Sequence, residues 1–108
     1  MNTEISQITP EELKEMKDSG NVKLIDVREK REWDYCKLEG AELIPVRNIQ
    51  RIDIDAEPDE TVVVYCHTGQ RSYFAAQILQ KRGYKNVLNL QGGIDAYSVR
   101  VDPEIPRY

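Results

Sequence analysis

The segment from Thr61 to Tyr65 constrains the fold of this chain more than any other. It reads Thr-Val-Val-Val-Tyr, so it is β-branched and nearly continuously apolar. A strand with one face in water alternates apolar and polar residues, whereas this pattern is typical of a central strand covered on both faces, as in parallel sheets. Shorter apolar runs at 22–26, 41–45 and 87–90 predict further strands of the same sheet.

Helical segments are expected between these strands. Thr9 can cap a helix that begins at Pro10, Glu12 completes a capping box, and Gly20 ends the helix. Further helices are predicted over 29–35, with Trp33 on the buried side, over 72–82 and from Gly93 to about Val101. The helix over 72–82 has an apolar face, expected to consist of Phe74, Ala75, Ile78 and Leu79.

Strands that alternate with helices at short intervals predict an α/β fold. We expect three layers, with a central, mostly parallel sheet of about five strands flanked by helices, and one domain over residues 1–108. Residues 48–54 fit either a helix or a loop, and the C-terminal residues 102–108, with two prolines, are expected to be extended.

Charge and hydropathy exclude several classes of function. The formal net charge is −4 with both signs interspersed, whereas a nucleic-acid partner requires a concentrated basic face. The longest apolar run is too short to span a bilayer, and residues 1–8 lack the pattern of a signal peptide, so a cytoplasmic location is expected. Cys36 and Cys66 are then expected to be free thiols, and no set of ligands has zinc-site spacing, so no metal is expected.

Chemistry is expected where the strands end, because open parallel sheets bind ligands at the carboxyl ends of their strands. The strand 61–65 delivers Cys66 to that edge, and a short loop and a helix follow. The N–H groups of such a loop and the helix dipole favour the thiolate, which is the reactive form of cysteine. The alternative is a cysteine that packs as a small apolar residue at the end of a core strand.

Two residues that follow Cys66 fit the reactive interpretation. Gly69 allows the loop to turn tightly, and Arg71 supplies a fixed positive charge and a donor fork for an anionic substrate. The strand 22–26 brings Asp26 and Arg28 to the same edge. We expect Asp26 and Arg28 to form a structural pair that supports the site rather than to act on substrate.

The segment Cys66-His67-Thr68-Gly69-Gln70-Arg71-Ser72 resembles the active-site loop of single-domain rhodaneses, with cysteine first, glycine fourth and arginine sixth. Other segments resemble further landmarks of that family and occur in the family's order. These are Asp26-Val27-Arg28-Glu29 with Glu32-Trp33, Gly40-Ala41 with Ile44-Pro45, and Leu90-Gln91-Gly92-Gly93.

The resemblance implies a sulfurtransferase that carries sulfane sulfur as a persulfide on Cys66. The loop residues His67, Thr68, Gly69, Gln70 and Ser72 would hold the charged sulfur, and Arg71 would orient an anionic donor. The donor would be thiosulfate or a persulfide protein, and the acceptor cyanide, a thiol or a sulfur-carrier protein. No cofactor is implied beyond the transient persulfide, and a monomer is expected.

Two alternatives remain open. Cysteine phosphatases and arsenate reductases have five residues between the cysteine and the arginine, whereas four separate Cys66 from Arg71 here. A silent rhodanese-like module that only binds a partner is the other alternative. Cys36 could act as a resolving thiol. Residues 102–108 resemble the ending of rhodanese domains fused to enzymes that activate ubiquitin-like sulfur carriers.

Overall fold

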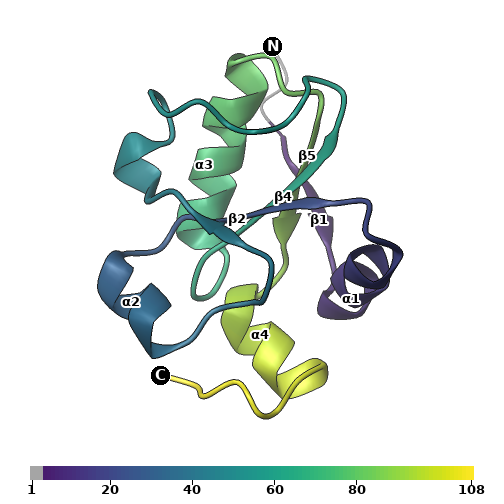
Figure 1. Ribbon diagram of the computed structural model, residues 1–108, viewed down its shortest axis with the longest axis vertical. Helices are drawn as coiled ribbons and strands as arrows, with labels where there is room; N and C mark the ends of the chain where they lie inside the picture. The colour runs from purple at the N-terminus through teal and green to yellow at the C-terminus, as the bar shows by residue number, and fades with distance from the viewer. Residues whose placement is uncertain (1–3) are drawn as a thin grey trace.

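The computed structural model describes residues 4–108. The sequence analysis considered residues 1–8 as a possible signal peptide, and residues 1–3 of that segment lie outside the described part. Helices and strands alternate along these residues (Figure 1). In chain order they are β1 (Ser6–Ile8), α1 (Pro10–Ser19), β2 (Lys23–Asp26), α2 (Lys30–Tyr35), β3 (Glu42–Leu43), the 3-10 helix η1 (Val46–Asn48), β4 (Thr61–Tyr65), α3 (Gln70–Lys81), β5 (Asn86–Leu90) and α4 (Gly93–Arg100).

The strands form one five-stranded sheet in the order β1-β5-β4-β2-β3, and every pairing is parallel. The predicted α/β fold with a central sheet of about five strands is therefore confirmed. The central strand is β4, which pairs with β2 on one side and with β5 on the other. This arrangement places the ends of β2, β4 and β5 next to one another.

Two apolar cores lie on opposite faces of the sheet because side chains alternate along each strand. Val62 and Val64 of β4 point into the core beneath α3, and Val63 and Tyr65 point into the core beneath α1 and α4. All four side chains are fully buried. The continuous apolar pattern of this strand is thus explained by cover on both faces.

The predicted helix starts and ends are close to the observed ones. Thr9 and Glu12 form the expected capping box at the start of α1, and Gly20 caps its end with a φ of 77°. None of the helices in residues 4–108 has the length and apolar character needed to cross a bilayer.

The apolar face predicted for the helix over 72–82 is partly wrong. Phe74 is 58% exposed, whereas Ser72, Ala75, Ala76 and Leu79 are buried. Two stripes of small or apolar residues overlap on this helix. The stripe that contains Ser72, Ala75, Ala76 and Leu79 packs against the sheet, whereas Phe74 lies outside it. Trp33 was also expected on a buried side, but α2 has no buried residue and Trp33 lies half-buried beneath the Lys37 side chain.

The edge strand β1 was not predicted, because Ser6 and Gln7 are polar and the strand has only three residues. It pairs with β5, from Ser6 opposite Leu88 to Ile8 opposite Leu90. The ambiguous segment 48–54 begins with the last residue of η1 and continues as a loop over 49–54, although Ile49 is fully buried in the core beneath α3.

Leu79→Ala is expected to destabilise the fold by about 2–5 kcal/mol, because Leu79 is fully buried and the change leaves a cavity. Phe74→Ala on the same helix is the matched control, and its exposed ring is expected to contribute less than about 0.5 kcal/mol. Urea unfolding followed by Trp33 fluorescence measures both variants. Equal losses of stability would mean that the packing face of α3 is assigned incorrectly.

Candidate active site

The carboxyl ends of three neighbouring strands bring the candidate residues together. Asp26, the last residue of β2, lies opposite Tyr65, the last residue of β4, and Cys66 follows directly. On the other side of β4, Asn89 of β5 lies opposite Val64. Polar side chains therefore gather at the carboxyl ends of the strands, which is the edge of the sheet predicted from the sequence to hold the site.

Two backbone N–H donors and one hydroxyl oxygen surround the sulfur of Cys66. The backbone N–H of Gly69 lies 3.1 Å from Sγ, the N–H of Ser72 lies 3.4 Å away and the hydroxyl of Ser72 lies 3.3 Å away. The donors belong to the loop and to the first turn of α3, where the helix dipole is positive. Such an arrangement stabilises a negative charge on sulfur. Cys66 itself is only 1% exposed.

Gly69 makes this loop possible. Its φ of 107° lies in the left-handed region, which is costly for residues with a Cβ atom. The turn directs its N–H toward Sγ and its carbonyl toward Asn89. The role expected for Gly69 from the sequence therefore has a defined geometry.

Asn89 is a site residue that the sequence analysis missed. Its side chain is buried, accepts a hydrogen bond of 2.5 Å from the Ser72 hydroxyl, and donates to the Gly69 carbonyl at 3.0 Å. Asn89 thus fixes both residues that donate to the sulfur. A polar amide within the otherwise apolar strand 87–90 was the available signal, because a buried amide requires hydrogen-bond partners.

The first turn of α4 holds the loop from behind. The N–H of Ile94 donates to the Cys66 carbonyl at 2.9 Å, and the N–H of Asp95 donates to the His67 carbonyl at 3.1 Å. Gly93, with a φ of 64°, is needed for this approach, since a Cβ atom there would overlap both carbonyl groups. The clamp satisfies N–H groups that otherwise lack partners at the start of a helix.

Arg71 does not point freely into solution. Its two terminal nitrogens donate to the two carboxylate oxygens of Glu32 in α2, at 2.8 and 2.9 Å. Hydrogen bonds from Arg71 lower the pKa of Glu32 to about 2, although partial burial opposes the shift. The same pair raises the pKa of Arg71 above its ordinary value. The predicted anion-binding residue is therefore already paired with an anion.

Tyr108 reaches the site from the C-terminal segment, which runs back from α4 toward α2 (Figure 1). Its hydroxyl donates to Glu32 at 2.7 Å and accepts from Arg28 at 3.0 Å. Its ring stacks on His67 with centroids 3.9 Å apart and planes inclined by 12°. Burial raises the pKa of Tyr108 to about 12, so its hydroxyl keeps the proton that it donates to Glu32.

Two contacts hold the C-terminal segment in this position. The Ser98 hydroxyl donates to the Ile105 carbonyl at 2.6 Å, and Arg107 pairs with Asp95 at 2.9 Å. Asp95 also belongs to the turn that clamps the loop after Cys66. The segment is thus attached to the same helix end that supports Cys66.

Asp26 and Arg28 form an ion pair of 2.6 Å, and both side chains are fully buried. The guanidinium of Arg28 also donates to the Cys36 carbonyl at 2.6 Å and to Tyr108. These bonds satisfy both charges, which is the condition under which a buried pair is tolerated. The pair joins β2 to the segment after α2 and does not contact Cys66.

The remaining predicted loop residues contribute unequally. Thr68 and Gln70 are exposed on the outer side of the loop. The His67 ring packs against Tyr108, and its Nε2 is buried without a hydrogen-bond partner in the described structure. Cys36 is half-buried and, like Cys66, a free thiol. Within residues 4–108, no three His, Cys, Asp or Glu side chains are grouped closely enough to hold a metal ion.

Comparisons with known proteins agree on one family. A family model described as a rhodanese-like domain matches residues 9–100. A probable adenylyltransferase/sulfurtransferase of Mycobacterium tuberculosis, MoeZ, is 42% identical over 95% of this chain, which spans 27% of the length of MoeZ. A sulfurtransferase of Allochromatium vinosum is 35% identical, and the alignment covers 87% of this chain and 89% of that protein.

Solved structures give the same result. A protein of Staphylococcus saprophyticus, SSP1007, has a TM-score of 0.80 and 32% identity, and the match covers 95% of this chain and 100% of that chain. The human single-domain sulfurtransferase TSTD1 has a TM-score of 0.83 over 90% of this chain and 98% of its own. At 22% identity, the second match shows the fold alone.

Gly93→Ala is expected to destabilise the protein by about 3–5 kcal/mol, because the added methyl group pushes the loop carbonyls away. Gly83→Ala is the control, since Gly83 also has a positive φ of 107° but has open space around it. The control should lose only about 1–2 kcal/mol from backbone strain. Urea unfolding gives both values, and NMR shifts of the Gly69 and Ser72 amides should change only in Gly93→Ala. Similar results for the two variants would refute the clamp.

The Glu32 carboxyl group is expected to titrate near pH 2, well below its ordinary value near 4.5. Because the pKa is lower in the folded state, the stabilisation by its pair with Arg71 is complete above about pH 4.5 and is lost as the pH falls through about 2. Carbon-13 NMR of the side-chain carboxyl group measures the midpoint. Arg71→Met should raise it toward 4.5, and a wild-type midpoint already near 4.5 would contradict the pairing.

Proposed function

The chain belongs to the rhodanese-like domain family, and on that premise we propose that it is a sulfurtransferase that carries sulfane sulfur as a persulfide on Cys66. The observation that carries this proposal is the convergence of the Gly69 and Ser72 N–H groups on the Cys66 sulfur. A site of this kind holds a thiolate before the transfer and a persulfide anion after it.

The first half-reaction loads the sulfur. The Cys66 thiolate attacks the sulfane sulfur of the donor, a new S–S bond forms, and the bond between that sulfur and the rest of the donor breaks. The electron pair of the broken bond departs with the leaving group. Sulfite leaves when thiosulfate is the donor, and a thiolate leaves when the donor is a persulfide.

The second half-reaction returns the enzyme to its initial state. A nucleophile such as cyanide or a thiolate attacks the outer sulfur of the persulfide, and Cys66 departs as a thiolate. The same donors stabilise this leaving thiolate, so one arrangement serves both steps. Gly69 and Ser72 donate directly, whereas Asn89 is a positioning residue because it holds both of them.

The acceptor class that we propose is a sulfur-carrier protein. A relative in Bacillus subtilis is named a putative sulfur carrier protein and is 30% identical over 83% of this chain. The name of MoeZ combines adenylyltransferase with sulfurtransferase, and residues 102–108 resemble the ending of such fusions. We further propose that the chain acts as a monomer in the cytoplasm and that the persulfide is its only prosthetic group.

Incubation of the reduced protein with thiosulfate or cysteine persulfide is expected to add the mass of one sulfur atom. Cyanide or dithiothreitol should remove it, because both attack the outer sulfur of a persulfide. Intact-mass spectrometry detects the change, which should be absent in Cys66→Ser. Cys36→Ser is the matched control, since it removes the other cysteine and should load normally.

Either of two results would count against the proposed function. Wild-type protein that gains no sulfur from either donor would favour a module that only binds a partner. Loading that persists in Cys66→Ser would place the sulfur on Cys36 instead. A resolving Cys36 thiolate would attack the inner sulfur of the persulfide, form a disulfide with Cys66 and release hydrosulfide. A disulfide that appears after loading in wild type and is absent in Cys36→Ser would identify that role.

A further inference from the structure

Glu32 is held in place more firmly than an ordinary surface carboxylate. It accepts hydrogen bonds from both terminal nitrogens of Arg71, from the hydroxyl of Tyr108 at 2.7 Å and from the backbone N–H of Glu29 at 3.0 Å. Its side chain is only 12% exposed, against 38% for Arg71. A two-pronged pair with two additional donors has little freedom to open. The negative charge of Glu32 is therefore a fixed part of the active-site wall.

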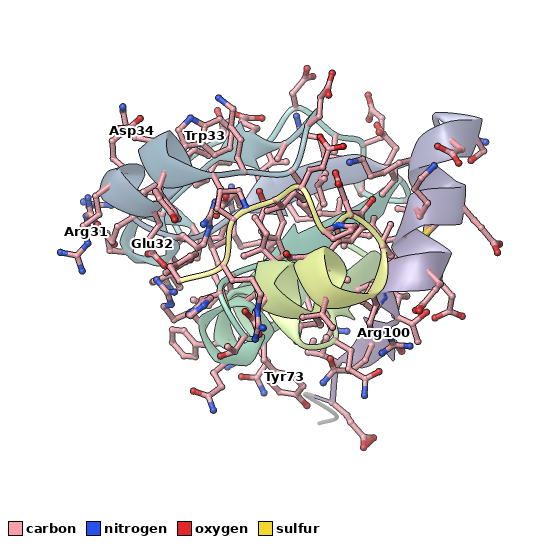
Figure 2. The ribbon with its side chains drawn as sticks, turned by 90° about the horizontal axis from the view of Figure 1, so that it is seen from below. Arg31, Glu32, Trp33, Asp34, Tyr73 and Arg100 are labelled. Atoms are coloured by element: carbon pink, nitrogen blue, oxygen red, sulfur yellow. The ribbon has the colours of Figure 1, made fainter. Side chains whose placement is uncertain are left out.

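This carboxylate changes the charge that a donor meets. Arg71 is the one arginine of the catalytic loop, and Glu32 neutralises it. Other nearby arginines are paired as well, Arg28 with Asp26 and Arg47 with Glu29. Arg31 of α2 lines a shallow hollow together with Glu32, Tyr35 and Tyr108, and its side chain extends outward (Figure 2). In each of these three ion pairs a carboxylate therefore compensates the charge of the arginine.

Charge bears directly on the choice of donor. Thiosulfate has two negative charges, and it must approach a Cys66 thiolate that already has one. A protonated persulfide, R–S–SH, is neutral at its transferable sulfur. The thiolate of Cys66 bonds to the outer sulfur, the S–S bond of the donor breaks, and R–S⁻ leaves with the electron pair. One negative charge is present before and after this step, so it does not require a cationic wall.

We propose that Glu32 is a specificity-determining residue, which cancels the charge of Arg71 and so disfavours doubly negative donors relative to thiol-derived persulfides. This inference rests on the proposed function, because it concerns the donor of the same reaction. Tyr108 is a positioning residue in this scheme. Its hydroxyl links Glu32 to the buried pair of Asp26 and Arg28 and keeps the carboxylate against Arg71.

The test compares two donors in wild type and Glu32→Gln. Glutamine has the same size and shape, but it removes the charge and replaces one acceptor oxygen with an NH2 group. The measured quantity is the rate at which Cys66 gains sulfur in a single turnover, followed by intact mass at increasing concentrations of thiosulfate or cysteine persulfide. Glu32→Gln should lower the half-saturating thiosulfate concentration about tenfold and change the value for cysteine persulfide by less than about twofold.

Two further variants separate specificity from general damage. Asp34→Asn removes the same charge from the same helix, but Asp34 points outward and pairs with Lys30, so the donor ratio should stay within about twofold of wild type. Tyr108→Phe keeps the ring on His67 and removes the hydrogen bond to Glu32. It should shift the donor ratio in the same direction as Glu32→Gln, by a smaller factor, and it tests the inference independently if Glu32→Gln folds poorly.

Salt supplies a second readout. An uncompensated arginine attracts a dianion less strongly as ionic strength rises. Loading by thiosulfate should therefore become salt-sensitive in Glu32→Gln and remain nearly insensitive in wild type. A structural defect alone has no reason to produce this difference.

The outcomes distinguish the two proposals. If wild type loads sulfur but Glu32→Gln and Tyr108→Phe leave the ratio of the two donors unchanged, the inference about Glu32 is wrong and the proposed function stands. The same holds if both donors improve or decline together. If wild type gains no sulfur from either donor, both proposals are overturned.

Discussion

The backbone contact between the loop after β4 and the first turn of α4 is the constraint on which the rest of the site depends. Two N–H groups of α4 hold the carbonyls of Cys66 and His67, and only a glycine at position 93 permits the two segments to approach this closely. The loop can then direct its own N–H groups at the sulfur on its other side. The charge on sulfur is thus stabilised by a loop that is itself supported, and little reorganisation is required when the charge changes.

A second set of contacts extends from the interior to the surface. Asp26 and Arg28 are fully buried, Tyr108 bonds to Arg28 and to Glu32, and Glu32 bonds to Arg71. Each side chain forms a hydrogen bond or ion pair with the next, so the buried pair of Asp26 and Arg28 and the partly exposed Arg71 belong to one network. Such networks stabilise an arrangement only when all members are satisfied. This network fixes the position of Arg71, the only arginine in the loop segment from Cys66 to Ser72.

The sequence was sufficient for the parts of the site that are local along the chain. A buried strand, a cysteine, a glycine and a helix start follow one another within 61–72, and their geometry follows from ordinary rules for strands and helix ends. Glu32, Asn89 and Tyr108 could not be placed in this way, because they reach the loop from α2, β5 and the C-terminal segment. The exposure of Phe74 was missed for a related reason. Helical spacing allowed two overlapping stripes on α3, and only the packing against the sheet distinguishes them.

The clamp by α4 also has a consequence for the order in which the site is assembled during synthesis. Residues 66–72 leave the ribosome before residues 93–95, so the nascent loop lacks the N–H groups that hold its carbonyls. Asn89, which fixes Ser72 and Gly69, emerges late as well. The hydrogen bonds that hold the loop around Sγ are therefore complete only after β5 and the first turn of α4 have folded against it.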